Sequence, residues 1–179
     1  LTHKSYSYAA ESMLGHMAEL ERADEGIFKL GMNSLLMWPK ILSELKERYG
    51  HKVYFSDQGS LVIHHHLDKG SFDHFTQTLS SKLTHEYSDS CELVDVSEYE
   101  SDLSKFSNGL LLKNEAQLDG HQLLNALHDV IRNEGCWVEQ LVSSINPNTI
   151  VLENGSKLNY EWVFDCRGLA AKSDIEGLH

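Results

Sequence analysis

The sequence lacks long apolar runs, an excess of basic residues and paired cysteines, and each absence argues against a class of protein. Its apolar runs cover only a few residues, as at 110–112, whereas a membrane-spanning helix needs roughly 20. Fifteen basic residues against 27 acidic ones give a net charge of −12 without a basic cluster, which argues against a nucleic-acid partner. Cys91, Cys136 and Cys166 are widely spaced, which argues against a disulfide framework or a structural zinc site and favours a reducing cytoplasm.

Two further features are missing near the start of the chain. No Gly-x-Gly-x-x-Gly run occurs, although such a run opens a dinucleotide-binding fold because its glycines let the backbone approach a pyrophosphate. No secretory signal pattern opens the sequence, which begins at Leu1 and not at methionine. We therefore expect a piece of a longer protein, with 41% hydrophobic residues to build a core.

The first half of the chain predicts alternating helices and strands. Residues 23–49 read as one long helix, with a buried face formed by Ile27, Leu30, Ser34, Leu35, Trp38, Ile41, Leu42 and Leu45. Pro39 predicts a kink or a join between two shorter helices, and Gly50 a helix end. Residues 52–66 predict a hairpin around Asp57–Gly59, followed by a helix over 67–86 and a strand over 92–97.

The second half predicts a change from helix to consecutive strands. A strand and turn over 108–119 precede an amphipathic helix over 120–133, which Gly135 closes. Strands follow over 136–145 and 149–160, the latter with a hairpin at Asn154-Gly155. The run Trp162-Val163-Phe164 then predicts a final buried strand before an Asp-Cys-Arg-Gly corner, a pattern typical of the closing strand of a nucleotide-binding sheet.

Four stretches in order carry a resemblance to a known family: SYAAESMLGHMAELERAD, NSLLMWPKIL, AQLDGHQLLNAL and VFDCRGLAAK. Together they resemble the FAD-dependent glycine/D-amino-acid oxidase family, and within it the glycine oxidases of thiamine biosynthesis. The likeness covers nearly all 179 residues, but only the middle of a typical family member. It implies that the glycine-rich unit lies upstream of Leu1, and that the part with the arginine that binds the substrate carboxylate follows His179.

The resemblance implies a mixed α/β fold: an antiparallel-sheet substrate domain with flanking helices, plus late strands of an FAD-binding Rossmann-like domain. The implied division is a flavin-contacting segment at 1–20, a partial substrate-binding domain at 21–119 and a returning part of the FAD domain at 120–179. The implied cofactor is FAD, and the implied partner is a small-molecule amino-acid substrate. A homo-oligomer is expected from the same likeness.

Roles carried over from the family fall on three stretches. Ser7, Ala9 and Ala10 would line the flavin, while Glu11, Ser12 and Met13 would face the flavin or the substrate. The backbone of Val142 would touch adenine, and Cys166, Arg167 and Gly168 would form a turn beside the dinucleotide, where glycine permits a close approach. This sequence departs from the family pattern at Glu11-Ser12, where relatives have Ala-Gly before the methionine.

The family's chemistry would be oxidation of the amine of glycine or a small amino acid to an imine, which hydrolyses to a keto acid and ammonia while oxygen becomes peroxide. One alternative is an amino-acid dehydrogenase that uses an acceptor other than oxygen. The other is a truncated, non-catalytic domain without cofactor, which the missing glycine-rich loop favours.

Two clusters of polar residues invite other interpretations. His64 and His66 would share one face of a strand while His65 points away, which leaves at most two metal ligands, so a solvated strand end is favoured over a metal site. The acidic run over 98–102 is interpreted as a wet surface turn, because nothing nearby would shield a carboxylate pair from water.

Overall fold

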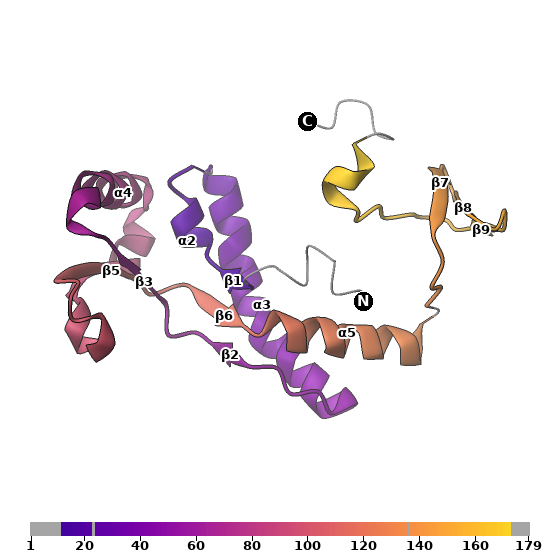
Figure 1. Cartoon of the computed structure of the whole chain (residues 1–179), viewed down its shortest axis with the longest axis horizontal. Helices are drawn as coiled ribbons and strands as arrows, with labels where there is room; N and C mark the ends of the chain where they lie inside the picture. The colour runs from indigo at the N-terminus through magenta and orange to yellow at the C-terminus, as the bar shows by residue number, and fades with distance from the viewer. Residues whose placement is uncertain (1–11, 23, 136, 173–179) are drawn as a thin grey trace. The chain divides into compact units, whose positions relative to one another are not determined.

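The computed structural model describes residues 12–22, 24–135 and 137–172 of the chain (Figure 1). The chain divides into two compact units, Leu1–Gly135 and Cys136–His179. The boundaries predicted after residues 20 and 119 separate the flavin-contacting, substrate-binding and FAD-binding parts of a flavoprotein. The division into compact units does not test them, so they stay predictions. None of the helices in the described part of the chain combines the length and apolarity that a bilayer crossing requires.

The first unit combines helices with short antiparallel strands. Its helices are α2 (His16–Glu19), α3 (Glu25–Tyr49), α4 (Lys69–Lys82) and α5 (Gly120–Glu134). Its strands are β1 (Met13–Leu14), β2 (Phe55–Ser56), β3 (Ser60–Ile63), β4 (Cys91–Asp95), β5 (Asn108–Leu112) and β6 (Ala116–Leu118). One sheet has the order β1-β6-β2 and the other β3-β5-β4. The mixed α/β class with small antiparallel sheets is as predicted.

The predicted hairpin around Asp57–Gly59 is wrong. Strand β2 pairs with β6, and β3 pairs with β5, so the chain crosses from one sheet to the other at this point and does not fold back on itself. Gly59 has a φ of 86°, and a Cβ there would lie 2.6 Å from the carbonyl oxygen of Leu112. The buried β5 backbone therefore takes the pairing that a local hairpin would have used, and only glycine allows this close approach.

Helix α3 is a single element with local signals at both ends. The Asp24 carboxylate accepts a hydrogen bond from the Ile27 N–H (3.0 Å), a capping interaction at the first turn. Gly50 ends the helix with a left-handed φ of 74°, as predicted. Pro39 lies inside the helix, so the predicted alternative of two shorter helices is wrong.

Helix α3 connects two buried clusters. The first joins α2, α3, α4 and β5 through Met17, Leu20, Phe28, Phe72, Leu79, Leu110 and Leu112. The second joins α3, β6 and α5 through Leu45, Leu118, Leu123 and Ala126. The predicted buried face is wrong at the start of the helix, where Ile27 and Leu30 are exposed and Phe28 is buried. The helix turns its Phe28 side toward α2 and α4 because the cluster there supplies the apolar contacts.

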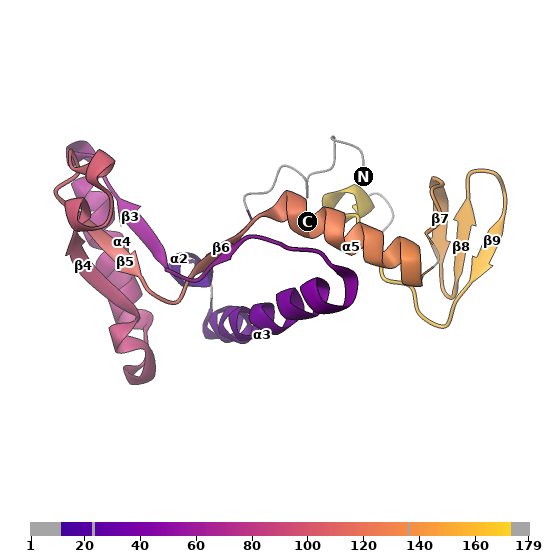
Figure 2. The same ribbon diagram turned by 90° about the horizontal axis from the view of Figure 1, so that it is seen from below.

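The second unit is an antiparallel meander of β7 (Val142–Asn146), β8 (Thr149–Leu152) and β9 (Lys157–Asn159), drawn side by side in Figure 2. The hairpin predicted at Asn154-Gly155 is confirmed, with Gly155 at a φ of 82° between β8 and β9. The final buried strand predicted at 161–166 is wrong: this stretch is not a strand, and Trp162 and Phe164 are 76% and 84% exposed. Apolar character alone does not make a strand; a paired neighbour is also needed.

Candidate functional site

The segment that begins at Ser12 is attached to the first sheet by a very short ladder. In this ladder, Met13 lies opposite Gln117 and Leu14 opposite Ala116. The Ser12 carbonyl accepts a hydrogen bond from the Leu118 N–H (3.2 Å), and Ser12 has a positive φ of 21°. Strand β6 therefore determines where the Met13 side chain lies.

Met13 lines an open hollow of about 560 Å³ between this segment and helix α3. Its side chain is 52% exposed. The wall on the α3 side carries the exposed Ile27 and Leu30. The hollow thus presents a thioether and two aliphatic side chains to a ligand, with the polar Glu19 and Ser34 also in its lining, which suits a flat, mostly apolar group with a polar edge. This is the candidate site.

His16 closes the floor of the hollow where α2 meets α3. Its residue is 9% exposed, its ring centroid lies 5.6 Å from that of Phe28, and its Nε2 lies 2.9 Å from Met32 Sδ. A Cβ on Gly31 would lie 2.2 Å from the His16 Cβ. Only a glycine at position 31 lets the two helices approach this closely.

A buried carboxylate lies next to His16. Glu115 follows β5 and is 1% exposed, and its Oε1 accepts a hydrogen bond from the Ala18 N–H (2.8 Å). Its Oε2 is buried and has no hydrogen-bond partner among the described residues. Burial lowers the pKa of His16, and the negative charge of Glu115 opposes that shift without cancelling it.

Four of the predicted flavin-lining residues, Ser7, Ala9, Ala10 and Glu11, lie outside the described residues. Met13 lines the hollow, and Ser12 precedes it at the start of the described chain. Val142 begins β7 opposite Leu152, in the second unit, and is partly exposed. No observation tests the predicted roles, so they stay predictions.

The Asp165–Gly168 corner is held together by its own side chains. The Arg167 guanidinium donates to both carboxylate oxygens of Asp165, at distances from 2.7 to 3.2 Å, and lowers the pKa of that carboxyl. Cys166 is exposed and free. Gly168 begins a short 3-10 helix (Gly168–Ala171) with a left-handed φ of 59°, and a Cβ there would meet no atom of the described residues within 4 Å. Its backbone therefore has open space beside it.

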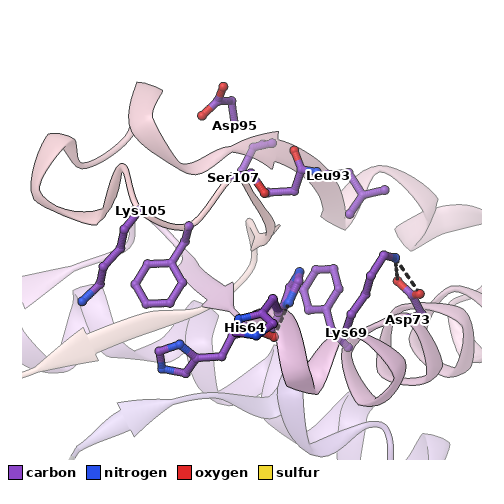
Figure 3. Close-up of a pocket in the computed structure, with 13 residues that line it drawn as sticks. His64, Lys69, Asp73, Leu93, Asp95, Lys105 and Ser107 are labelled. Atoms are coloured by element: carbon purple, nitrogen blue, oxygen red, sulfur yellow. Dashed lines mark hydrogen bonds and ion pairs between the residues drawn. The ribbon is translucent and has the colours of Figure 1, made fainter.

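A second hollow, of about 770 Å³, lies at the end of β3 and the start of α4 (Figure 3). His64, His65 and His66 line it, but the Lys69 ammonium is bound by Asp73 at 2.8 and 3.0 Å. The Asp95 carboxylate accepts hydrogen bonds from the backbone and hydroxyl of Ser97. Within the described residues, no three or more histidine, cysteine or carboxylate side chains cluster closely enough to hold a metal ion. The hollow's charges are mostly satisfied internally, so we prefer the Met13 hollow as the candidate site.

Comparison with known families shows to which family the chain belongs. Residues 3–179 match the family of FAD dependent oxidoreductases. The chain belongs to this family. Comparison with curated proteins gives no significant match.

Solved structures of three oxidases share the fold of this chain. Glycine oxidase from Geobacillus kaustophilus superposes with a TM-score of 0.71 at 16% identity, over 88% of this chain and 44% of its own. Glycine oxidase from Bacillus cereus ATCC 14579 superposes with a TM-score of 0.68 at 16% identity, over 88% of this chain and 45% of its own. Iminodiacetate oxidase from Chelativorans sp. BNC1 superposes with a TM-score of 0.66 at 15% identity, over 87% of this chain and 44% of its own. The chain thus spans less than half the length of these proteins. Its fold matches the corresponding part of glycine oxidase, as predicted.

The sequence interpretation missed His16, Gly31 and Glu115. Glu115 stands in the turn sequence Lys-Asn-Glu, where neighbouring polar residues indicate exposure. Gly31 stands inside a helix without any local need for glycine. These residues act through partners far away in the sequence, so no local pattern could have identified them.

Proposed function

We propose that the protein oxidises the amine of glycine or another small amino acid to an imine, with FAD as cofactor and oxygen as final acceptor. Water then converts the imine to a keto acid and ammonia, and oxygen becomes peroxide. The observation that carries the proposal is the hollow beside Met13. It is formed by the segment that resembles the flavin-facing stretch of glycine oxidases, in a chain whose family is FAD-dependent.

The residues at the hollow fit a flavin edge. Met13, Ile27 and Leu30 offer an apolar wall. By the family resemblance, Ser7, Ala9 and Ala10 would line the flavin, and Glu11 and Ser12 would face the flavin or the substrate. Val142, Cys166, Arg167 and Gly168 would hold the nucleotide part, and the open space at Gly168 supports a close backbone approach there.

When bound, FAD supplies the two-electron acceptor for the oxidation. The contribution of this chain is to orient the amino acid and to exclude water from its α-carbon, which apolar side chains at a wall do well. The Met13 thioether is flexible and polarizable, and so can adapt to a small substrate. We assign no acid or base to this segment.

The first test is the visible spectrum of the purified full-length protein, followed by release and identification of any pigment. Bound FAD, with peroxide formed from glycine or another small amino acid in air, supports the proposal. Bound FAD with turnover only on an artificial electron acceptor would favour the dehydrogenase alternative. A colourless protein would favour the non-catalytic one and overturn the proposal.

A matched pair of variants tests the place of the site. Met13→Ala is expected to raise the KM for the amino acid about tenfold, because the wall beside the reacting carbon is lost. Met37→Ala is the control, since Met37 is also an exposed methionine of the first unit but does not line the hollow. Equal kinetics for the two variants would contradict the placement.

A further inference from the structure

Glu115 is a charged residue in a place where charges are rarely found. Its side chain is among the largest that are fully buried in the described part of the chain. A carboxylate loses its hydration on burial, so it must be offset by hydrogen bonds or by a nearby charge. One oxygen has such a partner, the Ala18 N–H.

The turn that carries Glu115 is firmly anchored on its other side. The Lys113 N–H donates to the Ser90 carbonyl (2.8 Å), and the Lys113 ammonium lies 2.7 Å from the Glu92 carboxylate. The Asn114 amide donates to the Ser90 hydroxyl (2.7 Å). The carboxylate therefore extends from a fixed base beside β4 to the segment that carries Met13.

That segment is buried at Met17 and Leu20 in the first cluster, but it has few attachments close to Met13. Its β1 ladder pairs only Met13 and Leu14, and so short a ladder is weak by itself. The bond from Ala18 to Glu115 holds the chain just beyond the ladder, and the carboxylate also lies beneath Gly15, where a Cβ would be 3.7 Å from its Oε1. The ladder and the carboxylate thus hold the segment at two points, on either side of Gly15.

We propose that Glu115 is a positioning residue, which holds the Met13 segment in register with the substrate and the flavin through its bond to the Ala18 N–H. This inference rests on the proposed function. The requirement is for an acceptor oxygen at the correct reach. A glutamine meets it, and an aspartate, shorter by one methylene, does not. A role as the charge partner of His16 would make the opposite demand, because aspartate keeps the charge and glutamine loses it.

The test compares E115Q, E115D and E115A in the full-length protein with FAD bound. Acetate, an amine-free analogue of glycine, is titrated while the flavin absorption is followed, and KM and kcat for the amino acid substrate are measured in parallel. We expect E115D and E115A to raise the acetate Kd and the KM about tenfold or more, with kcat changed less, because displacement of a positioning segment weakens binding. E115Q is expected to stay within about threefold of the wild type.

N114A is the matched control, because it removes only the bond from Asn114 to Ser90 and leaves the two Lys113 contacts that also anchor the turn, and Asn114 makes no bond to the Met13 segment. It is expected to retain the wild-type acetate Kd. Equal losses in N114A and E115D would mean that the turn has a general structural role, and would overturn the inference. So would wild-type acetate binding in E115D, or a loss in E115Q without one in E115D.

The outcomes also separate this inference from the proposed function. A wild-type protein without FAD or turnover means that the proposed function has failed, and the inference fails with it. An active wild type with unaffected E115D means that only the inference has failed. If E115A does not fold, the contrast between E115Q and E115D still decides, since both keep a polar side chain at the buried position.

Discussion

At the scale of single residues, His16 shows two opposing effects on one side chain. Burial disfavours the charged imidazolium, and the Glu115 carboxylate favours it. Burial is the larger effect, so the folded-state pKa of His16 lies below its ordinary value of 6.5. The unfolded chain therefore binds more protons at this position than the folded one, just below neutral pH.

This difference predicts how stability depends on pH. The free energy of unfolding should fall as the pH drops from 7.5 to 5.5, through the range below 6.5 where the unfolded histidine takes up its proton. The His16→Phe variant should lose less stability over this range than the wild type, as measured by urea unfolding at both pH values. His74→Phe, which removes an exposed histidine, should behave as the wild type does. The same pH dependence in all three proteins would refute the role of His16.

At the scale of elements, the contact between α2 and α3 depends on the absence of one side chain. A Cβ on Gly31 would overlap the His16 Cβ and Cγ, at 2.2 and 2.7 Å. Because both atoms are close to the α2 backbone, the helix itself would have to move. The hollow beside Met13 shares this contact as its floor, so helix packing and the candidate site are coupled.

Gly31→Ala is expected to lower the free energy of unfolding by about 1–3 kcal/mol, the usual cost of overpacking, despite the better helix propensity of alanine. Gly70→Ala is the control, because Gly70 is also helical, in α4, and a Cβ there meets no atom within 4 Å in the part of the chain that the structure describes. That variant should gain about 0.4–1 kcal/mol. Denaturant unfolding measures both. A Gly31→Ala protein as stable as Gly70→Ala would show that α2 yields without cost.

At the scale of the whole molecule, the two units differ in how much core they contain. The two buried clusters defined by α3 lie entirely in the first unit. The buried apolar residues described in the second unit are Leu152 and Ala171. A chain segment of this size with so little buried apolar surface falls short of the conformational entropy lost on folding.

We therefore expect residues 1–135, expressed alone, to unfold in one cooperative thermal transition followed by circular dichroism. Residues 136–179, expressed alone, should show no cooperative transition. A gradual, non-cooperative loss of signal from 1–135 would mean that its clusters depend on the second unit. Cooperative unfolding of 136–179 would mean that its meander is stable with very little core.

Features that depend only on neighbouring residues could be predicted from the amino-acid sequence. Helix α3 and its end at Gly50, the Asn154-Gly155 hairpin and helix α5 all follow from local periodicity and left-handed turns. The family motifs also act at this level, because the ordered stretches from SYAAESML to VFDCRGLAAK were enough to identify an FAD-dependent oxidoreductase.

Which surfaces meet became known only from the tertiary fold. It paired β2 with β6 in place of a local hairpin, and it buried Glu115 in a turn that reads as exposed. It also turned Ile27 and Leu30 outward to form the wall beside Met13. Each outcome depends on competition between partners that are distant in the chain, and a local pattern contains no information about which partner supplies the larger buried contact.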